Sequence, residues 1–218
     1  MNNKKILENL IKQKAILISD YDKPFKLSGG EFSNYYYNSK NCILDPEGLD
    51  IISDLLLKEV RKFKVKSVGG LETGSIPLAT AICLKSSLTE SDPLSAFFVR
   101  KEPKKHGPQS DGPFAFFEGN PLSPIVIVDD VITTGKSVIN KTLDRIKELG
   151  MEVSGIICII DREQGAEELF KENNIEFHAL FRHSVDFKKY IDNKIDEKRK
   201  IYEQKKQKKR LEVPSVSH

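Results

Sequence analysis

The sequence contains no tryptophan, only two methionines and only three cysteines among its 218 residues. The cysteines, Cys42, Cys83 and Cys158, are odd in number and have no C-x-x-C spacing. This scarcity argues against a disulfide framework and against a zinc site built from paired cysteines. Scattered thiols are typical of reduced residues in a cytoplasmic protein, and we expect a cytoplasmic location.

The sequence also lacks any apolar run of the roughly 20 residues that a membrane-spanning helix requires. The first residues lead into an amphipathic pattern interrupted by Glu8, Lys12 and Lys14, which is not the apolar stretch of a signal peptide. We therefore expect no membrane partner. The 39% hydrophobic and 31% charged content instead indicates a globular domain with a charged surface.

Most of the chain lacks a positive excess, although the formal net charge is +3. Residues 194–210 hold nine lysines and arginines against three acids, a net charge of +6, and Glu212 is the only charge after them. Residues 1–193 therefore carry a net charge of −2. We predict one domain over residues 1–193, followed by a basic tail, 194–218, that is a solvated helix or a disordered extension. Nucleic acid is not an expected partner of that domain.

The most informative stretch runs from Ile125 to Ser137. Its first four residues predict a buried strand, Asp129 and Asp130 follow at the end of that strand, and Thr133 to Ser137 open a helical pattern. A helix N-terminus binds phosphate through its free N–H groups. The acceptor oxygens of two aspartates suit ribose hydroxyls or a Mg²⁺ ion. The stretch therefore predicts a site for a ligand that carries ribose, phosphate and a metal-bound diphosphate.

Other phosphate-binding motifs fit this stretch less well. A P-loop has the form G-x-x-x-x-G-K-[ST]. Gly135, Lys136 and Ser137 match its end, but Asp130 stands where its first glycine would fall. The dinucleotide motif G-x-G-x-x-G is absent here as well. An ordinary helix-capping turn would require one Asp or Thr and not the whole cluster.

The order of apolar strand, two acids, two residues and a Thr/Gly/Ser-rich loop resembles the phosphoribosyl-pyrophosphate (PRPP) signature of type I phosphoribosyltransferases. The resemblance implies that the two acids face the ribose hydroxyls and that the loop holds the 5-phosphate. It also implies Mg²⁺ as cofactor, held mainly by PRPP. The implied PRPP contacts here are Asp129, Asp130, Val131, Ile132, Thr133, Thr134, Gly135, Lys136 and Ser137.

A second cluster, Arg100 to Gly107, holds four cations and a histidine after a predicted strand. Charge runs are usually solvated surface, but a diphosphate leaving group requires cations, which a closing loop can deliver. The run resembles the catalytic loop R-K-x-x-K-x-H-G of orotate phosphoribosyltransferases. In that family the lysine matching Lys104 acts from the neighbouring subunit of a homodimer, whereas Lys105 has no assigned role. The implied PRPP contacts are Arg100, Lys101, Lys104 and His106, and the implied catalytic residues are Lys101, Lys104, Asp129 and Asp130.

A third cluster, Asp161 to Gly165, follows another predicted strand. The planar fork of Arg162 suits a carboxylate, although an arginine paired only with Asp161 or Glu163 is an equal alternative. The cluster is similar to the D-R-x-E-x-G stretch of the same enzymes. The resemblance implies that Arg162, together with Thr133, binds orotate.

The N-terminal pattern F-x-L-x-x-G-x-x-S-x-Y-Y, from Phe25 to Tyr36, is similar to the hairpin that closes over the base in that family. Some members carry a lysine where this chain has Ser28, and both Lys26 and Lys40 are open candidates to replace it. The tyrosines have the alternative role of packing in the core or in a dimer. Gly69 to Gly74 resembles the diphosphate-binding loop of the family.

Alternating strand and helix patterns predict an α/β fold with a mostly parallel central sheet flanked by helices. The resemblance makes this the type I phosphoribosyltransferase fold, with a hood over residues 1–45 and a long flexible catalytic loop within residues 100–120. Ligands of such sheets bind beyond the carboxyl ends of the strands. The predicted strands are 15–19, 25–30, 35–38, 66–70, 95–99, 125–128, 153–160 and 175–180, and the predicted helices are 4–14, 46–63, 76–85, the pattern from the 133–137 loop to 149, 164–171 and 185–191.

These motifs predict an Mg²⁺-dependent enzyme that converts orotate and PRPP to orotidine 5′-phosphate and diphosphate in pyrimidine biosynthesis. A phosphoribosyltransferase for another base is one alternative. A PRPP-sensing regulator that binds nucleic acid through the basic tail is another. His178 and His183 have no metal-ligand spacing and are interpreted as structural or surface residues.

Overall fold

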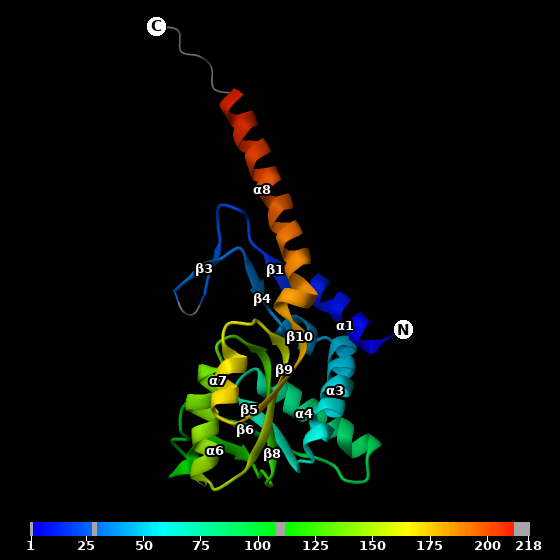
Figure 1. Cartoon of the computed structure of the whole chain (residues 1–218), viewed down its shortest axis with the longest axis vertical. Coiled ribbons are helices and arrows are strands. Elements are labelled where there is room, and N and C mark those ends of the chain that lie inside the picture. The colour runs from blue at the N-terminus through cyan, green and yellow to red at the C-terminus, as the bar shows by residue number, and fades with distance from the viewer. Residues whose placement is uncertain (1, 28–29, 108–111, 212–218) are drawn as a thin grey trace.

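The computed structural model describes residues 2–27, 30–107 and 112–211, and Figure 1 shows a central sheet with helices on both faces. The strand order is β10-β9-β8-β5-β6-β7. The first five strands run parallel, and β7 is antiparallel to β6. The predicted mostly parallel α/β sheet is thus confirmed. The strands are β5 Ser67–Leu71, β6 Ser95–Val99, β7 Phe117–Gly119, β8 Ile125–Ile132, β9 Val153–Asp161 and β10 Glu176–Arg182.

The helices lie on the two faces of this sheet because its central strand is apolar on both (Figure 1). Val126 and Val128 of β8 join one buried cluster with α3 and α4. Ile125 and Ile127, which point the opposite way, join a second cluster with α6 and α7. The helical segments here are α3 Pro46–Val60, α4 Ser75–Thr89, α5 Lys136–Val138, η4 Ile139–Leu143, α6 Asp144–Glu148 and α7 Ala166–Glu172.

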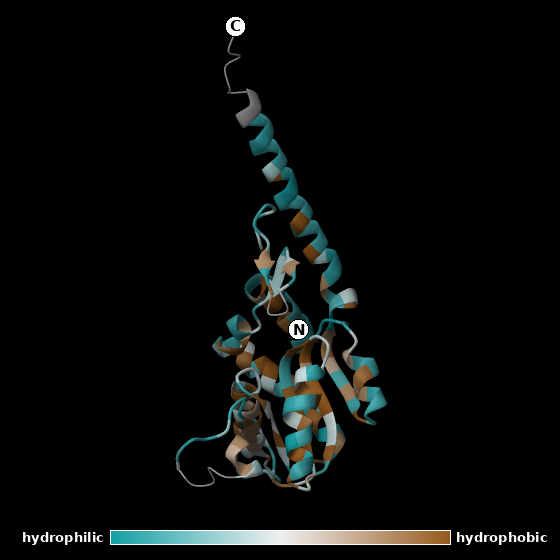
Figure 2. Cartoon of the chain, turned by 90° about the vertical axis from the view of Figure 1, so that its left-hand side faces the viewer, coloured by the Kyte–Doolittle hydropathy of each residue, from teal (hydrophilic) through white to brown (hydrophobic). Residues whose placement is uncertain are grey.

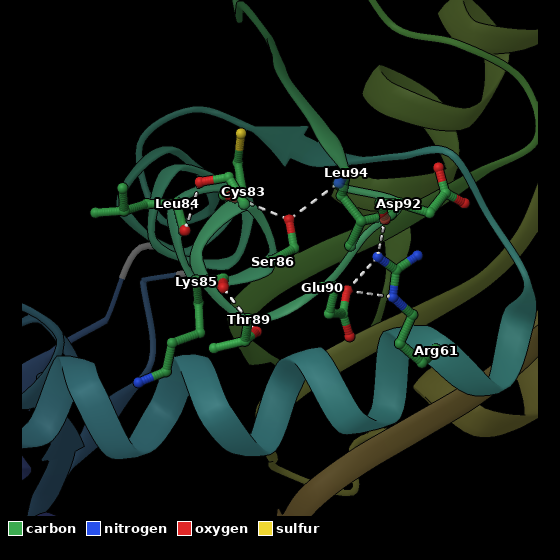
Figure 3. A network of polar contacts seen from close by, with 10 residues as sticks. Arg61, Cys83, Leu84, Lys85, Ser86, Thr89, Glu90, Asp92 and Leu94 are labelled. Atoms are coloured by element: carbon green, nitrogen blue, oxygen red, sulfur yellow. Dashed lines mark hydrogen bonds and ion pairs between the residues drawn. The ribbon is translucent and has the colours of Figure 1, made fainter.

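The start of α3 follows the sequence prediction. Asp45 has extended backbone, and its carboxylate accepts the Gly48 N–H at 3.0 Å, while Pro46 occupies the first helical position. The other end continues into a short 3-10 helix, η2 Arg61–Phe63. Figure 3 shows that Arg61 contacts Glu90 and the Asp92 carbonyl oxygen. These contacts fix the connection between α4 and β6.

The predicted strands 25–30 and 35–38 of the hood do not pair with each other. The segment from Phe25 pairs with β3, and β4 pairs with β1 in the register Ile16↔Tyr37. This pairing buries Ile16 and Tyr37 together, whereas the predicted hairpin would leave β1 without a partner. The hood elements are α1 Asn3–Leu10, η1 Ile11–Ala15, β1 Ile16–Ile18, β2 Phe25–Lys26, β3 Phe32–Ser33, β4 Tyr35–Tyr37 and α2 Lys40–Ile43.

Residues 100–120 were predicted without regular structure, and this is partly wrong. A 3-10 helix, η3 Pro113–Phe116, and β7 lie at the end of this stretch. Phe117 is buried and its ring stacks on Phe97, 6.3 Å away between centroids. A three-residue strand is too short to show a period in the sequence, so only its packing reveals it.

The predicted short helix 185–191 is wrong in extent. A π-helical turn, η5 His183–Phe187, leads into α8, Lys188–Leu211. The helix projects beyond the sheet and is mostly hydrophilic, as Figure 2 shows. Its contacts with the hood include Lys198 Nζ to Asp20 Oδ1 at 2.9 Å and Tyr202 against Tyr21. The predicted domain boundary after residue 193 falls inside α8 and stays a prediction. Within the described ranges, no helix has the length and apolar content needed to cross a membrane.

Candidate active site

The polar segments that follow β5, β6, β8 and β9 all lie at the carboxyl edge of the parallel sheet. The predicted end of the central strand needs correction, because β8 does not stop before the acids. Asp129 pairs with Cys158 and Val131 with Ile160 in the β9 ladder. The tertiary ladder overrides the low strand propensity of aspartate, so both acids have fixed positions on a strand.

Asp129 and Asp130 contact two other segments. The Asp130 carboxylate accepts a hydrogen bond from the Ser39 hydroxyl, and Lys40 Nζ lies 3.3 Å from it. A Cβ at Gly74 would overlap the Asp130 carboxylate and lie 2.9 Å from that of Asp129. A side chain at this position would displace the two carboxylates, so the turn after β5 lies directly against both acids.

The two carboxyls differ in protonation. Burial and the neighbouring charge of Asp130 raise the pKa of Asp129 well above its ordinary value. Burial also acts to raise the pKa of Asp130, but hydrogen bonds from Ser39 and from the Asp129 carboxyl, with the charge of Lys40, outweigh it and lower that pKa. Asp130 is therefore the more acidic carboxyl of the pair.

The predicted phosphate loop, 133–137, makes the turn from β8 into the helical segments α5 to α6. Gly135 has φ +72°, and a Cβ there would lie 2.7 Å from the Phe170 ring, so this position requires glycine. Thr133 is half-buried, whereas Thr134, Lys136 and Ser137 are exposed. The exposed hydroxyls and helix-start N–H groups make a site that suits phosphate.

The start of the predicted catalytic loop is held in place. The Lys101 N–H donates to Glu72 Oε1 at 2.8 Å, and the Arg145 guanidinium donates to the carbonyls of Arg100 and Lys101. The guanidinium of Arg145 lies 3.6 Å from the centre of the Phe116 ring. This clamp joins α6 to the end of β6, and nothing in the sequence pattern indicated it.

The loop cations are turned towards β7. Lys104 Nζ lies 3.0 Å from Glu118 Oε2, and Arg100 lies 3.3 Å from Glu118 Oε1. Since β7 is three strands from β8, the two strands are about 14 Å apart. In the part of the chain that the structure describes, no ion pair joins Lys104 to Asp129 or Asp130. Lys101, Lys105 and His106 are exposed.

Arg162 does not form the ion pairs that the sequence left open. Asp161 accepts the Glu163 N–H and lies 4.0 Å from Arg182, and Glu163 accepts hydrogen bonds from Ser184. The alternative of a surface arginine paired with either acid is therefore wrong.

The guanidinium of Arg162 instead faces the hood. It donates to the Tyr35 hydroxyl at 3.3 Å and lies 5.3 Å from the centre of that ring. Its Nε is buried and has no hydrogen-bond partner among the described residues. No ion pair joins this guanidinium to a carboxylate of the described residues, so its charge is available to an anionic ligand.

The structure distinguishes the two lysines of the hood that could replace the lysine absent at Ser28. Lys40 reaches Asp130, whereas Lys26 lies exposed on β2, and Ser28 lies outside the described residues. The structure also adds residues that the sequence analysis missed, because each reaches the site from a distant segment without a motif of its own. They are Ser39, Glu118 and Arg145, together with the contacts of His183.

Comparison with known proteins agrees with this geometry. The family described as "Phosphoribosyl transferase domain" matches residues 41–186. The orotate phosphoribosyltransferase of Aquifex aeolicus is 37% identical over 178 residues, which cover 81% of this chain and 93% of that protein. The orotate phosphoribosyltransferase of Rhodopseudomonas palustris is 43% identical over 159 residues, covering 72% and 84%.

Solved structures agree as well. Mycobacterium tuberculosis orotate phosphoribosyltransferase in complex with Fe(III) dicitrate has a TM-score of 0.70 at 25% identity, covering 85% of this chain and 99% of that one. The same enzyme in complex with PRPP has a TM-score of 0.66 at 23% identity, covering 84% and 98%, and supports the fold. The fold and site define a phosphoribosyltransferase. Within that class, the chain belongs to the orotate phosphoribosyltransferase family.

Proposed function

We propose that this protein is an Mg²⁺-dependent orotate phosphoribosyltransferase, which converts orotate and PRPP to orotidine 5′-phosphate and diphosphate in pyrimidine biosynthesis. One observation carries the choice of substrate. Arg162 lies at the same sheet edge as the paired aspartates and the 133–137 loop, and its guanidinium contacts Tyr35 but forms no ion pair with a carboxylate among the described residues. A base that bears a carboxylate would satisfy that group.

The residues divide the reaction between them. The 133–137 loop holds the 5-phosphate, and Asp130, whose pKa is lowered, accepts from the ribose hydroxyls. Arg162, with Thr133, holds the orotate carboxylate and directs the base nitrogen N1 at the anomeric carbon. As the bond to the diphosphate oxygen breaks, the new bond to N1 forms, and the negative charge of Asp130 favours the developing oxocarbenium character. N1 reacts as the anion, so no general base is required.

The leaving diphosphate is assigned to the loop cations Arg100, Lys101, Lys104 and His106. Because Lys104 and Arg100 are paired with Glu118 on β7, they must leave that carboxylate before they can act on PRPP. We further propose that the active form is a homodimer in which the loop of one subunit serves the site of the other. We place the enzyme in the cytoplasm, which suits its three free cysteines.

The metal proposal fits the donor chemistry of the site. In the described ranges, no cluster of three or more His, Cys, Asp or Glu side chains is arranged to hold a metal ion. Asp129 and Asp130 nevertheless offer adjacent oxygen donors, which are the ligands that Mg²⁺ prefers. An ion held chiefly by the diphosphate, with these acids beside it, matches the residues present. When bound, Mg²⁺ would neutralise charge on the leaving group.

The decisive test is the loss of orotate absorbance after purified protein is mixed with PRPP and Mg²⁺. We expect a loss that requires both PRPP and Mg²⁺. Turnover with another base instead of orotate would favour a different phosphoribosyltransferase. PRPP binding by calorimetry without turnover of any base would favour a PRPP sensor.

The basic tail separates the enzyme from the nucleic-acid-binding regulator. Lys198 and Tyr202 contact the hood, so a truncation should begin after Glu203 and leave those contacts intact. We expect the truncated enzyme to keep its activity. A regulator that uses the tail would instead lose its nucleic-acid partner.

A further inference from the structure

His183 lies next to Arg162 in space although 21 positions separate them in sequence. In the parallel pair β9 and β10, Arg182 is in register with Asp161. Arg162 and His183 are therefore the next residues at the same carboxyl edge of adjacent strands, which lie about 4.8 Å apart. This placement brings a residue with no assigned role to the proposed base site.

The ring of His183 is fixed from the core side. Its Nδ1 lies 2.9 Å from the hydroxyl of Tyr37, which is only 5% exposed and packs against Phe187. Burial raises the pKa of Tyr37, so its phenol keeps its proton. The hydrogen bond between this hydroxyl and His183 Nδ1 fixes the orientation of the imidazole ring.

A second contact of the His183 ring reaches the proposed base site. Its ring stacks on Tyr35 with 5.3 Å between centroids and 10° between planes. The same Tyr35 accepts a hydrogen bond from Arg162 and lies beneath its guanidinium. A continuous chain of contacts thus runs from buried Tyr37 through His183 and Tyr35 to Arg162.

We propose that His183 is a positioning residue that holds Tyr35, and through it Arg162, in the orientation that receives the carboxylate of the base. This inference rests on the proposed function. It gives His183 no contact with substrate. Burial and the positive charge of Arg162 lower the pKa of His183, which keeps the ring neutral beside the guanidinium. A neutral ring can stack on Tyr35 without repelling Arg162.

The first test is His183→Ala, with steady-state kinetics for both substrates. Loss of the aromatic pair should raise KM for orotate about fivefold, with kcat and KM for PRPP nearly unchanged. His183→Phe keeps a ring for Tyr35 and should hold KM for orotate near the wild-type value, although it loses the Tyr37 hydrogen bond. Equal KM increases in both variants, or no increase in either, would overturn the proposal.

His178→Ala is the matched control. His178 lies towards the other end of β10 and has its own contacts with Glu59 of α3 and with Glu176. It should leave both KM values unchanged. A similar rise in KM in this variant would mean that general loosening of β10, and not the Tyr35 stack, is responsible.

A double-mutant cycle shows whether the effect passes through Tyr35. In a Tyr35→Ala background, His183→Ala should cause no further increase in KM for orotate, whereas a fully additive increase would contradict the proposed route. Arg162→Ala separates the two levels of the argument. If it leaves KM for orotate unchanged, the proposed carboxylate site fails. If it raises KM and His183→Ala does not, only the positioning role fails.

Discussion

Arg162 and Lys104 are both cations with a proposed role in catalysis, but the structure treats them in opposite ways. Arg162 is held between β9 and the hood, with one buried nitrogen unsatisfied among the described residues. Lys104 has its ammonium group on Glu118, and its side chain is only 15% exposed. In the proposed mechanism the base side of the site is therefore prearranged, whereas the diphosphate side requires an existing ion pair to break.

This contrast has a chemical reason. A carboxylate that is present throughout the reaction can be bound by a permanent partner. The diphosphate must leave as product, and a cation that moves can stabilise its charge in the transition state and then release it. The comparison predicts different kinetic signatures for the two cations.

The largest effect is expected from Lys104→Ala. We expect turnover to fall by about 10²- to 10³-fold with the fold intact, because charge stabilisation of the leaving group is lost. Steady-state rates with saturating substrates and circular dichroism provide the measurement. Lys105→Ala, which changes the adjacent exposed lysine, is the control and should remain near wild type. Near-normal turnover of Lys104→Ala would remove this residue from the mechanism.

Arg162→Ala should act on binding more than on turnover. We expect KM for orotate to rise about 10- to 100-fold, as for a lost charge-assisted hydrogen bond, with a much smaller change for PRPP. Arg182→Ala is the matched control, because Arg182 lies at the same edge but pairs with Glu167. Equal changes in both KM values for Arg162→Ala would argue against a carboxylate site.

Glu118→Gln tests the ion pair between Lys104 and Glu118. If the Glu118 pair opposes catalysis, its removal should raise kcat/KM for PRPP about two- to threefold, the scale of a partly exposed ion pair. Glu102→Gln removes the same charge from the loop itself and controls for net charge. A decrease in kcat/KM for Glu118→Gln would show that the observed Lys104 position supports the reaction.

Contiguity along the chain explains which features the sequence predicted. The strand, the two acids and the glycine-containing turn are contiguous from Ile125 to Ser137, so periodicity and residue chemistry were sufficient to find them. The helix at Asp45 was predictable because its cap is local. The central sheet followed from the alternation of strands and helices.

Long-range contacts explain what was missed. Tyr35, His183 and Arg162 come from three distant segments, and no local pattern shows that they meet. The pairing of β4 with β1 depends on which residues the core buries, and β7 is too short to show a period.

The smallest expected effect is on the pH dependence of stability. It tests whether the buried Asp129 carboxyl, which lies beside the prearranged part of the site, lowers the stability of the folded protein. Asp129 has a raised pKa in the folded protein, so the folded state keeps a proton that the unfolded chain loses near pH 4. Stability must therefore fall as pH rises from about 4 towards the folded pKa. Asp129→Asn removes this group and should be more stable than wild type, by a margin that grows over this range, while it loses activity.

Thermal unfolding of each variant and of the wild type between about pH 2 and 8 measures the margin. Asp45→Asn is the matched control with the opposite sign. Hydrogen bonds from Lys14 and the Gly48 N–H lower the pKa of Asp45, so its contribution is present above the ordinary pKa and disappears as pH falls. The loss of stability in Asp45→Asn should thus shrink towards low pH. A stability difference between Asp129→Asn and wild type that stays constant with pH would contradict this prediction. It would show that ionisation of the buried Asp129 carboxyl does not lower the stability of the folded protein.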